Sequence, residues 1–263
     1  MTTIKPLATA FAAVSLGLAA GFAGAAQAAS FTTLELNVAK AFLDNAVLSS
    51  VNGESTMVRE VRGHFGKDPV VIDAARYAEA AGGPRVAKAP RVIITGLVGS
   101  MTSGRDGIVR VGPFVPGDGY TRVEQCFDAR ADTTGSLGRL GYLGAYRFVC
   151  RPAPREGDVY PLVDCRTVPM LLNHFNDGLD KAAAAIAAKR AGRSAPFSEV
   201  LVKGVEMAAV LPDGLRAACT KGVVPCLVAY HDAAQSMEFH EMMSEGIEEA
   251  GEAIDRRIKE LGL

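Results

Sequence analysis

Two histidines and two methionines near the C-terminus form the clearest chemical cluster in the sequence. His231 precedes Asp232, and Met237, His240 and Met243 follow at intervals of three residues. On a helix this spacing places the last three side chains on one broad face. Imidazole with thioethers suits copper, and imidazole with carboxylates suits zinc. One hypothesis is therefore a copper or zinc site on His231, His240, Met237 and Met243.

The same residues also allow a structural interpretation, which the pattern favours. Met243 begins an apolar stripe that continues through Ile247 and Ile254, so it is expected in the core. His240 and Glu241 match the front of a zinc-protease HExxH motif, but Ser244 stands where the second His is required. The usual zinc pair of that motif is therefore missing.

Two further histidines lie near groups that assist catalysis. His174 lies in Asn-His-Phe-Asn-Asp-Gly, residues 173–178, and His64 lies between two glycines. Capping turns explain such residues more often than catalysis does. A hydrolase with a dispersed site would need one of these imidazoles beside Ser100, Ser103 or a free Cys165.

The glycine-rich run at residues 96–105 does not match a phosphate-binding loop. It lacks the Gly-Lys-Ser/Thr ending of a P-loop and the spacing of a dinucleotide fingerprint. We therefore expect this run to be strand and turn.

The first 28 residues predict export. Lys5 is followed by an apolar run and by Ala26-Gln27-Ala28, the order of a secretory signal peptide with its cleavage site. Cleavage after Ala28 would leave 235 residues, expected as one domain over 29–263 with a possible subdivision near 166. The predicted location is periplasmic or secreted.

Charge and composition narrow the partners. After removal of the signal, 27 basic residues face 29 acidic residues, which argues against nucleic-acid binding and against a polybasic membrane patch. We expect a protein or small-molecule partner of the cell envelope and no membrane span after cleavage. The apolar fraction of 49% is that of a folded chain.

The five cysteines indicate disulfides in an oxidising compartment. The preferred pairs are Cys126–Cys150 and Cys219–Cys226, which would leave Cys165 free. A Cys150–Cys165 bond is the competing possibility, because sequence alone does not fix connectivity.

The order of elements predicts an α+β fold. Thr32 and Glu35 form a capping box before a first helix, and Pro69 opens a second helix over about 68–81. Strands are expected at 91–98, 108–115, 120–129 and 144–150, with an edge strand at 159–165. Short loops between them predict an antiparallel sheet of about four to five strands.

Helices follow the sheet, with one more strand expected at 223–230 and a long amphipathic helix over 236–261. The sequence contains no complete catalytic constellation. The favoured interpretation is an exported, disulfide-stabilised, non-catalytic binding or interaction protein. The alternatives are the copper or zinc protein on His231 and His240 and the hydrolase with a dispersed site.

Overall fold

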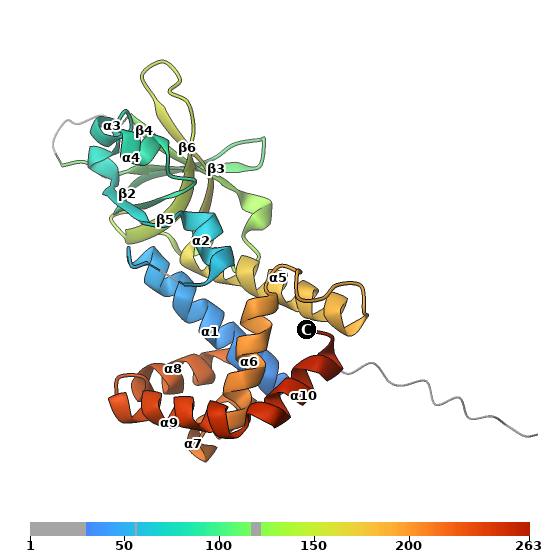
Figure 1. Ribbon diagram of the computed structural model, residues 1–263. Helices are drawn as coiled ribbons and strands as arrows, with labels where there is room; N and C mark the ends of the chain where they lie inside the picture. The colour runs from blue at the N-terminus through green and yellow to red at the C-terminus, as the bar shows by residue number, and fades with distance from the viewer. Residues whose placement is uncertain (1–29, 56, 117–121) are drawn as a thin grey trace, which may run out of the picture.

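The computed structural model describes residues 30–55, 57–116 and 122–263. The predicted signal peptide lies outside these residues. The chain forms a β-barrel and a helical part that meet at a waist, with the barrel at the top of Figure 1 and the helices below it. The predicted mixture of helices and strands is confirmed.

Six strands make the sheet, and five of them close into a barrel. They are β1 (Val70–Asp73), β2 (Val92–Ser103), β3 (Ile108–Pro113), β4 (Val123–Asp128), β5 (Ala145–Pro152) and β6 (Tyr160–Thr167). The order is β1-β2-β3-β4-β6-β5, and β5 also pairs with β2. The expected antiparallel sheet of four to five strands is instead closed into a barrel, because β2 is long enough to pair with β5 through its first half and with β3 through its second.

Two strand pairs are parallel, β1 with β2 and β4 with β6. The order β2-β3-β4-β6-β5, closed onto β2, is the Greek-key order of the OB-fold barrel. This topology identifies the architecture and leaves the function to be argued from particular residues.

Strand β1 replaces the beginning of a predicted helix. Val70–Asp73 pairs in parallel with residues 92–95 of β2, beside the part of β2 that β3 does not reach. The chain then turns through η1 (Ala74–Arg76) into two one-turn helices, α3 (Tyr77–Ala80) and α4 (Pro84–Ala87). The tertiary pairing overrides the local helix signals.

The helical part is organised around α1 (Thr33–Val51). Its predicted capping box is present, with Thr32 Oγ1 accepting from Glu35 N and Thr32 N donating to the Glu35 carboxylate. Arg257 donates to both carboxylate oxygens of Glu35, at 2.8 and 2.9 Å. One carboxylate therefore caps the first helix and fixes the last one against it.

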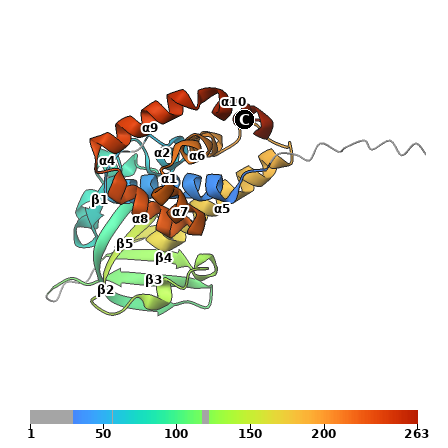
Figure 2. The ribbon, with the colours of Figure 1, turned by 90° about the horizontal axis from the view of Figure 1, so that it is seen from below.

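The remaining helices surround α1 and α6 (Figure 2). Figure 1 shows α5 crossing the waist. Their bounds are α2 (Arg59–Phe65), α5 (Val168–Ala187), α6 (Ser198–Val210), α7 (Asp213–Lys221), α8 (Val223–Ala233), α9 (Met237–Glu249) and α10 (Gly251–Leu261); two short 3₁₀ turns, η2 (Ala129–Ala131) and η3 (Leu137–Arg139), lie between β4 and β5.

Two helical regions differ from expectation. The strand predicted at 223–230 is helix α8. The single long helix predicted at 236–261 is two helices, because α9 ends at Glu249 and α10 begins at Gly251, with Ala250 between them. Glycine is a weak helix former, and the break lets both halves contact α6.

A buried cluster joins the barrel to the helices. Ile93 of β2 and Val149 of β5 lie in the same apolar cluster as Leu43 of α1 and Leu171 of α5. Burial of this shared apolar surface makes separation of the two parts costly. No helix in the described part of the chain is long and apolar enough to cross a membrane.

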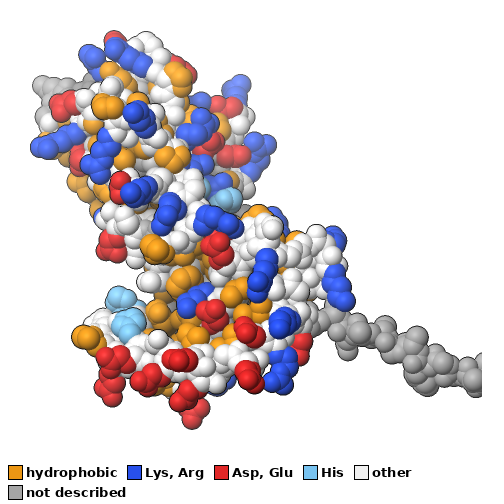
Figure 3. Space-filling view, viewed as in Figure 1, with side chains coloured by type: hydrophobic (Ala, Val, Ile, Leu, Met, Phe, Trp, Pro, Cys, Tyr) orange, Lys and Arg blue, Asp and Glu red, His pale blue; other side chains and the backbone are white. Residues whose placement is uncertain are grey.

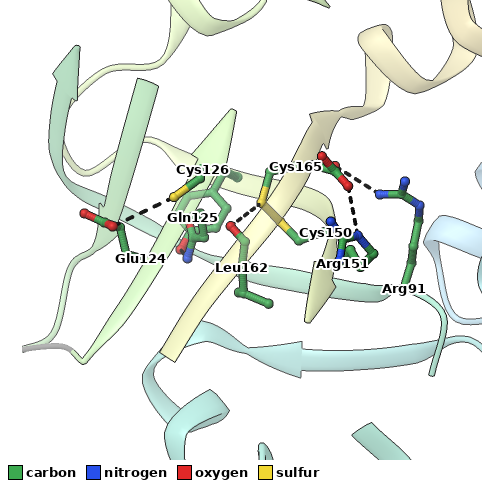
Figure 4. The surroundings of a disulfide bond; sticks show 10 residues. Arg91, Glu124, Gln125, Cys126, Cys150, Arg151, Leu162 and Cys165 are labelled. Atoms are coloured by element: carbon green, nitrogen blue, oxygen red, sulfur yellow. Dashed lines mark hydrogen bonds and ion pairs between the residues drawn. A yellow bond between two sulfur atoms is a disulfide. The ribbon is translucent and has the colours of Figure 1, made fainter. Parts of the chain in front are cut away.

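The cysteines form two disulfides, Cys150–Cys165 and Cys219–Cys226, and Cys126 is free. The preferred Cys126–Cys150 pair is wrong, and the competing Cys150–Cys165 pair is the one present. Cys126 lies on β4, whose neighbours are β3 and β6, whereas Cys150 on β5 faces β6 (Figure 4). Strands β4 and β5 follow one another in the chain but do not pair in the barrel, because β6 lies between them. Cys126 and Cys150 are therefore on strands that are not neighbours.

Thiol chemistry tests this connectivity. Burial and the neighbouring Glu124 raise the pKa of Cys126 to about 11, so the native oxidised protein should expose one thiol that reacts slowly with an aromatic disulfide reagent. Non-reducing peptide mapping should recover the 150–165 and 219–226 links, in wild type and in Cys126→Ser alike. A peptide linking residues 126 and 150 would contradict the structure.

A buried carboxyl between α1 and α5 makes stability depend on pH. Asp44 is only 6% exposed and accepts a hydrogen bond from Asn176 Nδ2 at 2.9 Å, while Asn176 Oδ1 is buried without a partner in the structure. Desolvation raises the pKa of Asp44 from 3.8 to about 6. Between about pH 4 and pH 6 the folded state therefore keeps a proton on Asp44 that the unfolded state loses. The free energy of unfolding falls as pH rises through this range, because Asp44 must then be charged while buried.

Asp44→Asn should remove this penalty, because the new amide can donate to the unpartnered Asn176 Oδ1. We expect the free energy of unfolding at pH 7.5 to rise by about 1–3 kcal/mol. Urea unfolding at pH 4.5 and 7.5 measures the free energy of unfolding of the variant and of wild type. Asp255→Asn, at an exposed position, is the control. An Asp44→Asn protein no more stable than wild type at pH 7.5 would contradict the assignment.

Candidate functional site

The predicted metal residues lie on two successive helices. His231 is exposed on α8, and Met237, at 79% exposure, begins α9. His240 has a ring nitrogen 2.9 Å from the carbonyl oxygen of Ala234, and Met243 is buried in an apolar cluster with Phe239. The expected core role of Met243 agrees with this cluster.

The described residues contain no group of three or more His, Cys, Asp or Glu side chains arranged to hold a metal ion. His240 is engaged with a backbone carbonyl, and Met237 and Met243 differ sharply in exposure. The copper or zinc hypothesis therefore stays a prediction without a further observation in its favour.

The serine candidates lie on the barrel. Ser100 and Ser103 belong to the second half of β2, and Gly96 and Gly99 lie in the same strand, so the glycine-rich run is strand rather than a phosphate loop. Cys165 is in a disulfide and offers no nucleophilic thiol. The ring contacts of His64 and His174 are made with one another and with phenylalanines.

The structure instead brings the two isolated histidine candidates together at the waist. His64 on α2 and His174 on α5 have ring centroids 6.1 Å apart. Phe175 packs edge-on against His64 at 5.2 Å. Residues 110 positions apart in sequence thus form one cluster where the helices meet the barrel.

Beside His174 is a hollow of about 160 Å³. It is lined by Ala131, Thr133, Arg166, Met170, Asn173, His174 and Asp177. Arg166 comes from β6 and is half-buried, and its guanidinium makes no hydrogen bond or ion pair with any residue that the structure describes. We call this feature the Arg166 hollow.

The loop that forms one wall of the Arg166 hollow is firmly held. Asp132 accepts hydrogen bonds from Thr134, Ser136 and Leu137, and the Ser136 hydroxyl lies 2.6 Å from Thr167 Oγ1. Thr167 in turn caps α5 by accepting from Met170 N. These bonds tie the wall to the strand that carries Arg166.

Asn173 closes the contact across the hollow by donating from Nδ2 to Thr133 Oγ1 at 3.1 Å. Asn173 and His174 are successive residues of α5, so both project from one turn of the helix. The lining is therefore fixed on three elements: β6, α5 and the loop after η2.

More cations surround the Arg166 hollow. Arg91, at the start of β2, donates to the carbonyl oxygen of Asp164 at 3.0 Å, and Arg151 donates to the carboxylate of Asp164 at 2.9 Å (Figure 4). Asp164 is thus already engaged by Arg151, and Asp177 is the acid in the lining. In Figure 3, Lys and Arg side chains gather at the waist near a His.

The electrostatics of the waist disfavour added positive charge. Desolvation, helped by Arg166, lowers the pKa of Arg91, and desolvation lowers the pKa of Arg166 itself. Asp164 acts in the opposite direction on both arginines. Desolvation followed by Arg166 and Arg91 lowers the pKa of His174, although Asp177 acts in the opposite direction. The pKa of His64 falls to about 3, mainly through burial. Both imidazoles are neutral near pH 7.

An anion in the hollow would offset the repulsion between Arg166, Arg91 and His174. It would pair with the free guanidinium of Arg166 and favour the protonated form of His174. The hollow has room for one small group such as a phosphate, a sulfate or a carboxylate. Arg166, Asn173 and His174 are the polar groups in the lining that could bond to such a group, and Asp177 is the one that would repel it.

Sequence reasoning singled out His174, Asn173, Asp177 and His64 separately, and it missed Arg166. No local pattern marks an arginine in a strand as unpaired, since pairing depends on where acids from other elements lie. The signal available in sequence was a small excess of arginine. Residues 147–166 hold four arginines, at 147, 151, 155 and 166, and three acids, at 156, 158 and 164.

Comparisons with known proteins provide no precedent for this site. No family model matches the chain, and neither does any curated protein or solved structure. Function must therefore be argued from the geometry.

His64 provides a test of the electrostatics at the waist. Its pKa of about 3 lies below the ordinary 6.5, so the unfolded state binds the proton first, and stability is lost as pH falls from about 6.5 towards 3. Its Nε2 is also buried without a partner in the structure. His64→Phe, surrounded by Phe65 and Phe175, should therefore unfold less readily in acid.

At pH 5 we expect the free energy of unfolding of His64→Phe to exceed that of wild type by about 1–2 kcal/mol, with a smaller difference at pH 8. Chemical denaturation at both pH values measures this, and the exposed His231→Asn serves as the control. Equal acid sensitivity of His64→Phe and wild type would show that His64 titrates normally.

Proposed function

We propose that this is an exported, disulfide-stabilised binding protein that holds the anionic group of a small ligand in the Arg166 hollow. Two disulfides are compatible with export to an oxidising compartment. The observation that carries the proposal is the half-buried guanidinium of Arg166, which lines a hollow and makes no hydrogen bond or ion pair with the described residues, although Asp164 acts on it from a distance. Periplasmic or secreted localisation is part of this proposal.

A partly desolvated guanidinium that makes no hydrogen bond or ion pair is costly unless something else compensates it. Desolvation already penalises Arg166, and a bound carboxylate or phosphate would accept two hydrogen bonds from its planar fork. Asn173 and His174 supply further polar groups in the same lining. These side chains recognise and orient an anion.

Binding should be linked to proton uptake. His174 is neutral at pH 7 because its pKa is lowered. A bound anion would raise this pKa again, because a nearby negative charge favours the protonated imidazole. His64, Arg91, Asp177 and Lys181 are the other charged or titratable groups that face this region. Affinity for the anion should therefore rise as pH falls from about 8 to 6.

Isothermal titration of the mature protein with inorganic phosphate, sulfate and acetate in a low-chloride buffer tests the proposal. We expect at least one anion to bind, more tightly at pH 6 than at pH 8, and Arg166→Gln to weaken it at least about tenfold. Arg166→Lys should bind with intermediate affinity, because it keeps the charge and loses the fork.

The matched control is Arg256→Gln, which removes an exposed arginine on α10 and should bind like wild type. Failure of all three anions to bind at low salt would refute the proposal. So would an Arg166→Gln protein that folds like wild type by circular dichroism and binds equally well.

A further inference from the structure

Helix α8 carries an apolar stripe that faces solvent. Val224 and Val228 are 70% and 56% exposed, and His231 is exposed with them. Residues at positions i, i+4 and i+7 lie on one side of a helix, so these three side chains form one continuous surface. We call this surface the α8 face.

The composition of α8 is that of a buried helix. Residues 222–237, which comprise α8 and the turns on either side of it, contain one charged residue, Asp232. At the chain's average of 22% charged residues, a stretch of this length would hold about three or four. A surface helix normally has a polar outer side, whereas a helix that is apolar on every side is normally buried. The α8 face therefore fits an interface better than open solvent.

The inner side of α8 is already packed, which fixes the direction of the outer side. Cys226 is buried and bonded to Cys219 of α7, and Tyr230 lies edge-on to Phe239 of α9, with ring centroids 5.7 Å apart. Helix α8 also packs on α1, and in Figure 1 it lies at the left of the helical part, away from α5. The α8 face is therefore held outward before any partner binds.

The two ends of the α8 face carry opposite charges. Lys221 immediately precedes the helix, Asp232 lies in its last turn, and both are exposed. Neither side chain makes an ion pair or hydrogen bond with any residue that the structure describes. A helix dipole favours acids in the first turn, but α8 has none there, and no side chain caps its N-terminus. An acid supplied from outside would therefore be stabilised at that end.

We propose that the α8 face is the contact between two copies of this chain. A two-fold axis across the middle of α8 runs the two helices antiparallel, so that each apolar face meets itself. The same symmetry places Asp232 of each copy near Lys221 and the uncapped N-terminus of the other α8. An uncharged stripe with a base at one end and an acid at the other is thus complementary to itself.

The length of α8 limits the affinity of this contact. A helix of 11 residues is about 16 Å long, so the contact is at the small end of the range for protein interfaces. We therefore expect a reversible dimer with a dissociation constant of about 1–100 µM. The Arg166 hollow lies at the waist, outside this contact, so the inference is independent of the proposed anion site.

Analytical ultracentrifugation of the mature protein from about 5 to 500 µM tests the inference. We expect the average mass to rise from that of a monomer towards that of a dimer. Val228→Glu, which puts two carboxylates close to the two-fold axis, should weaken dimerisation at least about tenfold. Met57→Glu, the same kind of change at an 88% exposed position before α2, is the matched control and should dimerise as wild type.

Exchange of the end charges tests the antiparallel arrangement. Lys221→Glu and Asp232→Lys should each weaken the dimer about three- to tenfold, because each sets like charges opposite one another. The double variant sets opposite charges against one another again, so it should regain most of the affinity. A double variant no better than either single variant would contradict the antiparallel pairing.

A protein that stays monomeric at every concentration would overturn the inference, as would a dimer that Val228→Glu, folded by circular dichroism, leaves unchanged. Cosedimentation of the monomer with phosphatidylcholine vesicles, abolished by Val228→Glu, would also overturn it, because a membrane would then cover the α8 face. Arg166→Gln should dimerise as wild type, and Val228→Glu should bind anions as wild type, which separates the two proposals.

Discussion

The rest of the structure depends on the pairing of one strand, β2. Its first half hydrogen-bonds to β1 and β5, and its second half pairs with β3. This double use closes the barrel, because one strand belongs to both halves of the sheet. A close approach at Gly99, where an added Cβ would lie 2.7 Å from Pro113 O, accompanies the shift in register. Closure leaves β2, β3, β4, β5 and β6 without a free edge between them.

Strand β2 also connects the waist with the outer face of the barrel. Arg91 precedes its first residue and lies among the cations at the waist. Ser100 and Thr102, in its second half, line a hollow beside Phe114 on the outer face of the barrel. The same strand holds the turn that presents Tyr142. The barrel therefore positions Arg91 at the waist and part of the lining of the hollow beside Phe114.

The two surfaces differ in charge for a structural reason. On the exposed face of β3 and β4, Arg110 finds Asp106 on its own hairpin and Glu124 on the next strand. At the waist, β6 and α5 place Arg166 where the nearby Asp164 is engaged by Arg151 and Asp177 stands on the helix. Three arginines (Arg91, Arg151 and Arg166) thus share one aspartate, Asp164, and desolvation lowers the pKa of Arg91 and of Arg166.

The sequence by itself determined the local features of this protein. The sequence specified the capping box of Thr32 and Glu35, the five barrel strands, the Cys219–Cys226 pair and the core role of Met243, and all of these depend on residues close in the chain. Only the tertiary structure decided the closure of the barrel, the parallel β4–β6 pair, the Cys150–Cys165 bond and the β1 strand. It also decided that His64 lies beside His174 and that Arg166 is left unpaired. These features depend on which distant elements become neighbours, and local propensity and spacing carry no information about that.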